Sequence, residues 1–117
     1  MKIPSEIPWL SFFQAEPQLL DEDAPYYYNQ VKYEFTNGNH EKFIMTMTPS
    51  YSELKLEVFN SDTKELLGLL DLKNVEAIEI LGDRKEEKRI MITSPYGVIK
   101  IDLAPKYKIF INQLLVD

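Results

Sequence analysis

The sequence has no cysteine, one histidine and only four glycines among its 117 residues. The absence of cysteine excludes disulfide frameworks, cysteine-based zinc sites, iron–sulfur clusters and thiol nucleophiles. A chain that is stable without covalent cross-links suits a reducing compartment, so we expect a cytoplasmic protein. Pro4 and Glu6 stand where a signal peptide needs an apolar stretch, and we therefore predict a protein that is not exported.

Long hydrophobic runs and clusters of basic residues are also missing. No stretch without charge, such as residues 43–52, is longer than ten residues, whereas a membrane-spanning helix needs about 18 or more. The chain has two arginines and a formal net charge of −6, whereas nucleic-acid binders cluster several basic side chains to neutralise phosphates. We predict neither membrane insertion nor direct nucleic-acid binding. The acidity is attributed mainly to solubility, and a basic protein partner is the alternative explanation.

Sequence motifs for catalysis and nucleotide binding are absent as well. The four glycines lie at least 14 residues apart, so neither a phosphate-binding loop nor a dinucleotide fingerprint is present. His40 follows an Asn-Gly-Asn turn, and no serine lies in a Gly-x-Ser-x-Gly elbow. Glu53 and Glu57 have Lys55 between them on one strand face, which is typical of solvated carboxylates. We predict a non-enzymatic protein with no catalytic residue, no metal and no cofactor.

Residues 1–25 form a proline-rich, acidic segment that carries the single tryptophan. Four of the seven prolines fall here, which excludes a long helix or a central strand, although Ser5 and Pro8 can open a short helix. We expect an arm that packs on the rest of the chain. It is interpreted either as a lid over the core or as the partner-binding face, since aromatic residues dominate binding hot spots. The candidate partner-binding residues are Trp9, Phe12, Phe13, Asp21, Glu22, Asp23, Tyr26 and Tyr28.

Residues 26–117 are predicted to form a single β-rich domain. Apolar and polar residues alternate here with a period of two, and turn-forming residues separate the alternating segments. Gly68 lies within the fourth strand and indicates a bulge or bend there. The seven predicted strands are centred on residues 31–35, 43–47, 54–58, 66–72, 78–80, 90–92 and 99–103.

The last stretch fits two structures. Tyr107, Ile109 and Ile111 fit an eighth strand, whereas Tyr107, Phe110, Ile111, Leu114 and Leu115 fit the spacing of one helix face. Because the helical spacing has more matches, we predict a C-terminal helix over about 105–116. The expected fold class is therefore mostly β, with α+β at the margin.

The C-terminal half has a distinctive order of elements. A leucine-rich strand leads into residues 72–80, residues 89–93 follow, and a Pro-Gly turn precedes residues 98–103 and a helix carrying Phe110. In this order, residues 66–116 resemble the pleckstrin-homology-like superfold. The resemblance implies about seven antiparallel strands in a curled sheet or partly open barrel, with the helix at its open end. It favours protein binding over phosphoinositide binding, because residues 36–42 offer one lysine and one glutamate instead of several basic side chains.

The sequence thus predicts a protein-binding module, such as an inhibitor or immunity-type protein that neutralises its partner. The partner is expected to be another protein with a basic or apolar face, and the sequence does not predict an oligomeric state. The alternative is a small-ligand or lipid-binding β-barrel. In that alternative Phe43, Met45 and Met47 line a cavity, whereas in the first they fill the core.

Overall fold

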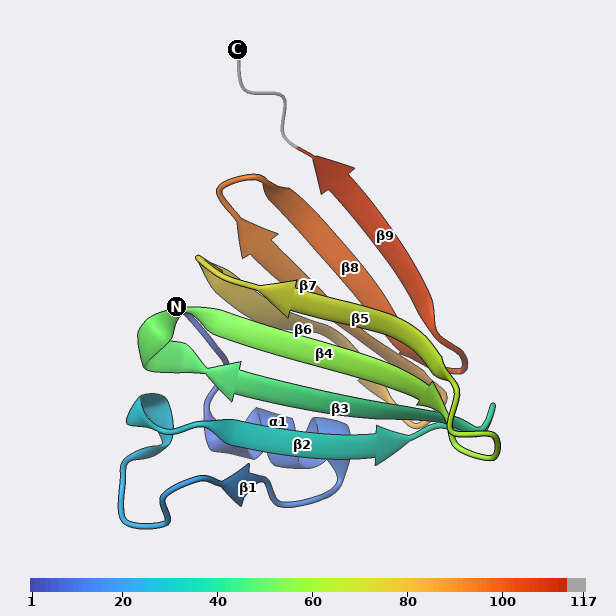
Figure 1. Cartoon of the computed structure of the whole chain (residues 1–117), viewed down its shortest axis with the longest axis horizontal. Helices are drawn as coiled ribbons and strands as arrows, with labels where there is room; N and C mark the ends of the chain where they lie inside the picture. The colour runs from blue at the N-terminus through green and yellow to red at the C-terminus, as the bar shows by residue number, and fades with distance from the viewer. Residues whose placement is uncertain (114–117) are drawn as a thin grey trace.

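The computed structural model describes residues 1–113, in which two antiparallel sheets pack face to face (Figure 1). The first sheet has the order β1 (Gln18–Leu19), β2 (Val31–Thr36), β3 (Glu41–Thr48), β4 (Glu53–Asn60) and β5 (Leu66–Leu72). The second sheet has the order β6 (Ala77–Arg84), β7 (Glu87–Ser94), β8 (Gly97–Ala104) and β9 (Lys108–Gln113). The helical elements are α1 (Glu6–Phe13) and the 3-10 turns η1 (Tyr26–Tyr28) and η2 (Pro49–Tyr51). The predicted mostly-β class is confirmed, and each of the seven predicted strands is present.

The alternation in the sequence places one face of each strand in the core. In β3, Phe43, Met45 and Met47 are buried, while the residues between them are only half-buried on the outer face. The antiparallel register sets Leu56 opposite Met45 on the same face. This is the geometry that a period of two demands of a strand with one buried face.

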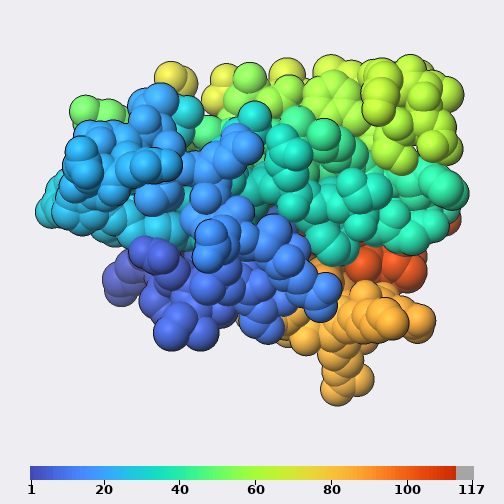
Figure 2. All heavy atoms as spheres, turned by 90° about the horizontal axis from the view of Figure 1, so that it is seen from below, coloured from blue at the N-terminus to red at the C-terminus, as the bar shows by residue number. Residues whose placement is uncertain are grey.

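Helix α1 completes the core from the side. It contacts β2 of the first sheet and β6 of the second, and its aromatic side chains Trp9, Phe12 and Phe13 are buried. In Figure 2 the blue atoms of the N-terminal segment lie below the teal atoms of the first sheet and beside the orange atoms of the β6–β7 hairpin. The N-terminal segment therefore contributes to the same core as the strands. No helix within residues 1–113 is long and apolar enough to cross a membrane.

The predicted helix over 105–116 is wrong for the residues that the structure describes, because β9 occupies Lys108–Gln113. The register sets Ile109 opposite Ile101 and Ile111 opposite Ile99, so pairing with β8 satisfies the backbone while Ile109 packs on the core. Residues 114–116, which supplied two of the helical matches, lie outside the described residues. The resemblance to the pleckstrin-homology-like superfold relies on a helix after the seventh strand, and a strand follows instead.

The curled sheet or partly open barrel is also replaced by a different arrangement. Within residues 1–113, β5 ends the first sheet and β6 begins the second, with no strand pairing between them. The sheets are therefore two separate layers with a shared core.

The bulge predicted at Gly68 is confirmed. Val58 pairs with Gly68, but the next residue, Phe59, pairs with Leu66, which leaves Leu67 as the extra residue. A Cβ atom on Gly68 would lie 2.6 Å from the hydroxyl oxygen of Tyr107, so a larger residue would require that ring to shift. The bulge thus brings β5 against the chain just before β9.

Candidate functional site

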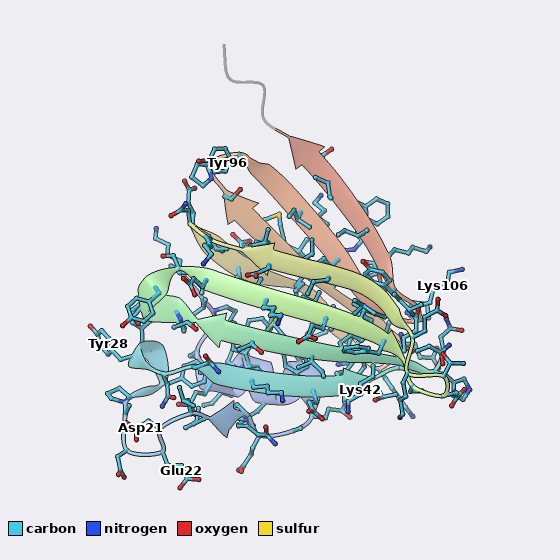
Figure 3. The ribbon with its side chains drawn as sticks, viewed as in Figure 1. Asp21, Glu22, Tyr28, Lys42, Tyr96 and Lys106 are labelled. Carbon is cyan, nitrogen blue, oxygen red and sulfur yellow. The ribbon has the colours of Figure 1, made fainter. Side chains whose placement is uncertain are left out.

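One end of the sandwich gathers exposed tyrosines and acids. The acids come from the loop after β1, and the tyrosines come from η1 and η2, which contact each other. Figure 3 shows Asp21, Glu22 and Tyr28 at this end, with Lys42 and Lys106 at the opposite end. We name this surface the tyrosine–acid face, and its residues are Asp21, Glu22, Asp23, Tyr27, Tyr28 and Tyr51.

The tyrosines of this face are open to solvent. Tyr28 is 70% exposed and Tyr51 is 74% exposed, although both rings are large enough to be core residues. The Tyr27 and Tyr28 rings meet edge to face with their centroids 5.4 Å apart, which fixes their relative orientation. Tyrosine is enriched in protein interfaces because it offers a rigid apolar ring together with a hydroxyl.

A buried asparagine holds the acidic loop in place. Asn29 is 3% exposed, and its side-chain amide donates hydrogen bonds to the carbonyl oxygens of Asp21 and Ala24. The Asp21 N–H donates to the Asn29 side-chain oxygen over 3.2 Å. The Asp21 carboxylate accepts from the Asp23 N–H over 3.0 Å. The acids therefore stand on a fixed loop, which reduces the ordering entropy lost when a partner binds.

The structure divides the predicted partner-binding residues into two groups. Asp21, Glu22, Asp23 and Tyr28 are exposed and lie together on the tyrosine–acid face. The remaining four are buried or half-buried, and they are Trp9, Phe12, Phe13 and Tyr26.

The burial of the aromatic arm favours the first of its two interpretations, a lid over the core, over a partner-binding surface. Trp9 and Phe13 stack with centroids 5.5 Å apart, and Phe13 stacks on Tyr33 of β2 at 4.6 Å. Tyr26 is half-buried, and its hydroxyl shares a hydrogen bond of 2.7 Å with that of Tyr33. Burial, followed by this hydrogen bond, raises the pKa of Tyr26 above its ordinary value, so its hydroxyl stays neutral. The arm is a lid whose rings form part of the core.

Tyr27 and Tyr51 were not among the candidate residues. Tyr51 belongs to the turn between β3 and β4, far in sequence from the acidic loop. The contact between η1 and η2 brings the turn that carries Tyr51 beside the turn that carries Tyr28. A run of three tyrosines is visible in the sequence, but which ring points outward depends on this packing.

The opposite end of the sandwich holds a pocket of about 510 Å³ whose walls include Phe35, Pro105 and three lysines, Lys85, Lys88 and Lys106. Lys88 is almost fully buried, and its Nζ lies 2.8 Å from a carboxylate oxygen of Asp83. The same ammonium lies 5.1 Å from the centre of the Phe12 ring. Its charge is therefore already compensated within the protein.

Buried Glu41 lies at the same end. Its carboxylate accepts hydrogen bonds from the Asn37 side chain over 3.0 Å and from the Tyr107 N–H over 2.7 Å. Burial raises the pKa of Glu41, but these hydrogen bonds outweigh it, and the pKa lies below its ordinary value. Glu41 thus joins the turn after β2 to the chain before β9, which is a structural task.

The residues considered for ligand binding or catalysis lie elsewhere. Phe43, Met45 and Met47 have no exposed surface and belong to the core, so they do not line a cavity as the β-barrel alternative requires. Glu53 and Glu57 lie on the outer face beside lysines. Within residues 1–113 no group of three or more His, Cys, Asp or Glu is placed to hold a metal ion.

Comparison with solved structures finds a similar fold in a chain of the contact-dependent growth inhibition toxin and immunity protein complex from Klebsiella pneumoniae 342. The TM-score is 0.70 and the sequence identity is 19%, and the match covers 97% of this chain and 96% of that chain. At this identity the likeness shows a shared fold. No model of a protein family matches the sequence, and no curated protein matches it.

Proposed function

We propose that this protein is an immunity-type protein, which binds a toxic protein and neutralises it without catalysing a reaction. The observation that carries the proposal is the shared fold with a chain of a toxin and immunity protein complex, along nearly the whole length of both chains. The likeness extends over the whole fold and is not confined to one motif.

We further propose that the tyrosine–acid face is the surface that meets the toxin. Its three carboxylates favour a partner surface that carries lysine or arginine, because complementary charges speed association and select partners. The exposed rings of Tyr28 and Tyr51 can pack against the apolar stems and cationic groups of those side chains. The toxin is neutralised by occupation of its basic surface.

Capture followed by a growth assay tests the function. The immobilised protein is exposed to a lysate of its host, and a protein retained in near-equal amount is identified by mass spectrometry. That protein is then expressed alone and together with this chain. We expect growth arrest in the first case and normal growth in the second. A retained protein that does not arrest growth contradicts the immunity function.

Matched variants test the surface. Tyr28→Ala with Tyr51→Ala, and separately Glu22→Lys, should weaken toxin capture by about 2 kcal/mol or more, as expected for interface hot spots. The control is Tyr96→Ala, because Tyr96 is similarly exposed but lies at the β7–β8 turn (Figure 3). Equal binding by all these variants while growth protection persists would assign the toxin contact to another surface.

A further inference from the structure

The edge strands of the two sheets differ in whether another segment of the chain covers them. The edge of β6 is covered by the N-terminal residues, because Lys2 bridges to Ala77 and exchanges backbone hydrogen bonds with Glu76 and Ile78, each 2.9 Å long. The edge of the first sheet at β1 is only two residues long. Within residues 1–113, β5 and β9 are the longer edge strands without a further strand beside them. Uncovered edges of this kind are sites where another chain adds a strand.

The β9 edge also exposes apolar side chains. Phe110 is 47% exposed on the outer face of the second sheet, and Ile111 is 63% exposed on its inner face. In Figure 1, β5 and β9 diverge from the end where Tyr107 covers Gly68. A pocket of about 240 Å³ lies between them, with walls that include Leu72 and Ile111.

We propose that β9 pairs with β9 of a second copy of this chain, antiparallel, about a two-fold axis at Phe110. In this register Phe110 faces the same residue of the second copy, and Ile109 faces Ile111 in both directions. Side chains opposite each other in an antiparallel pair lie on one face, so the outer and inner faces of the two sheets are continuous. A two-fold interface requires such self-complementarity.

The neighbouring registers are less favourable. Centring the pair on Ile111 sets Phe110 opposite Asn112, and centring it on Ile109 sets Phe110 opposite Lys108. The Phe110 register alone sets each apolar residue of 109–111 opposite an apolar residue, and an aromatic pair in a strand pair adds stability. The sequence of β9 therefore selects one register.

Charge is consistent with this arrangement. Lys108 faces Asn112 of the second copy, and the two Lys108 side chains are about 14 Å apart, since four residues separate them at about 3.4 Å each. That distance exceeds the screening length of about 10 Å at 0.1 M salt, so their repulsion is small. Lys100 and Lys108 next to this edge disfavour the basic partner proposed for the tyrosine–acid face. The register favours a second copy as the occupant, and the charge pattern permits it.

Sedimentation of the full chain over a range of concentrations, from micromolar to near-millimolar, tests the proposal. We expect a reversible rise in mass from 13.7 kDa to twice that value. Phe110→Glu places two like charges opposite each other on the axis and should raise the dimer dissociation constant about tenfold or more. Glu at this position also faces Lys100 of its own chain, so the variant is expected to fold.

A mixture of Phe110→Glu and Phe110→Lys should restore the dimer as a heterodimer, because only a pair centred on residue 110 brings these two charges together. Leu69→Lys, on the β5 edge, is the control and should leave dimer formation unchanged. The proposal is overturned by a constant mass of 13.7 kDa at all concentrations, or by a dimer that Leu69→Lys abolishes and Phe110→Glu does not. These outcomes are independent of toxin capture, so the dimer and the proposed function are tested separately.

Discussion

On the two long sides of the sandwich, the burial of side chains does not follow the hydrophobicity of the segments that supply them. On the α1 side, a proline-rich and acidic segment supplies Trp9, Phe12 and Phe13, which are among the most buried side chains. On the β5–β9 side, strands rich in leucine and isoleucine leave Leu69 and Ile111 largely exposed. Burial of a segment thus depends on whether a further element covers it, as well as on how hydrophobic it is.

The difference depends on which element covers each side of the sandwich. Helix α1 has three aromatic residues at positions i, i+3 and i+4, so one short helix covers the space between β2 and β6. Between β5 and β9, the described residues supply the Tyr107 ring at one end and no comparable helix. The closed side should therefore be sensitive to substitution, and the open side should be tolerant.

The largest expected effect is at Trp9. Trp9→Ala removes a fully buried ring and should lower the free energy of unfolding by about 3–5 kcal/mol, measured by urea denaturation. Ile7→Ala, on the exposed face of the same helix, is the control and should change it by less than about 0.5 kcal/mol. If Trp9→Ala left stability unchanged and weakened partner binding, the arm would be an interface and the comparison would fail.

The next effect concerns the ion pair that ties α1 to the second sheet. Asp83 accepts hydrogen bonds from Lys88 over 2.8 Å and from the Ser11 hydroxyl of α1 over 2.6 Å. Asp83→Ala leaves the buried Lys88 ammonium without its carboxylate and should cost about 3 kcal/mol. Lys88→Met, which removes the charge and keeps the volume, should cost much less. Equal losses in the two variants, measured by urea denaturation, would contradict this role of the charge.

The same carboxylate predicts a dependence on pH. Burial raises the pKa of Asp83, but hydrogen bonds from Lys88 and Ser11 outweigh it, and the pKa lies below its ordinary value. The stabilisation is complete above the unfolded pKa of about 3.9 and is lost as the pH falls through the lower folded pKa. Thermal melting of the wild type should therefore lose more stability below about pH 4 than melting of Asp83→Asn. Identical pH profiles would show that Asp83 is not coupled to folding.

A smaller effect is expected where Tyr107 packs closely on Gly68 on the open side. Gly68→Ala sets a Cβ atom 2.6 Å from the Tyr107 hydroxyl oxygen and should cost about 1–3 kcal/mol through overpacking. Adding Tyr107→Phe removes that oxygen and should restore part of the loss. A double-mutant cycle from urea denaturation measures the coupling. Purely additive losses would mean that the ring moves away without penalty.

The difference between the two sides also explains which parts of the structure could be predicted from the sequence. The seven strands and the bulge at Gly68 were predictable, because a period of two and turn residues report local structure directly. The strand at 108–113 was not predictable, because the helical spacing, which includes Leu114 and Leu115, has more matches in the local sequence. The segment is a strand because it pairs with β8, and this tertiary contact is not visible in the local pattern. The acids and Tyr28 were predictable as exposed polar or amphipathic residues near a turn. The burial of Trp9 and the place of Tyr51 depend on which elements meet in space.

The smallest expected effect is at an exposed residue of β5, which is compared with a half-buried neighbour in the same strand. Leu69→Lys replaces an exposed side chain that faces Glu57 across the strand pair, so it should change the free energy of unfolding by less than about 0.5 kcal/mol. Leu70, the next residue, packs on the core, and Leu70→Ala should cost more than about 1 kcal/mol. Both are measured by urea denaturation at a protein concentration low enough to keep the chain monomeric. The two residues are leucines in adjacent positions of one strand, so a loss at Leu69 as large as that at Leu70 would mean that Leu69 is covered in solution.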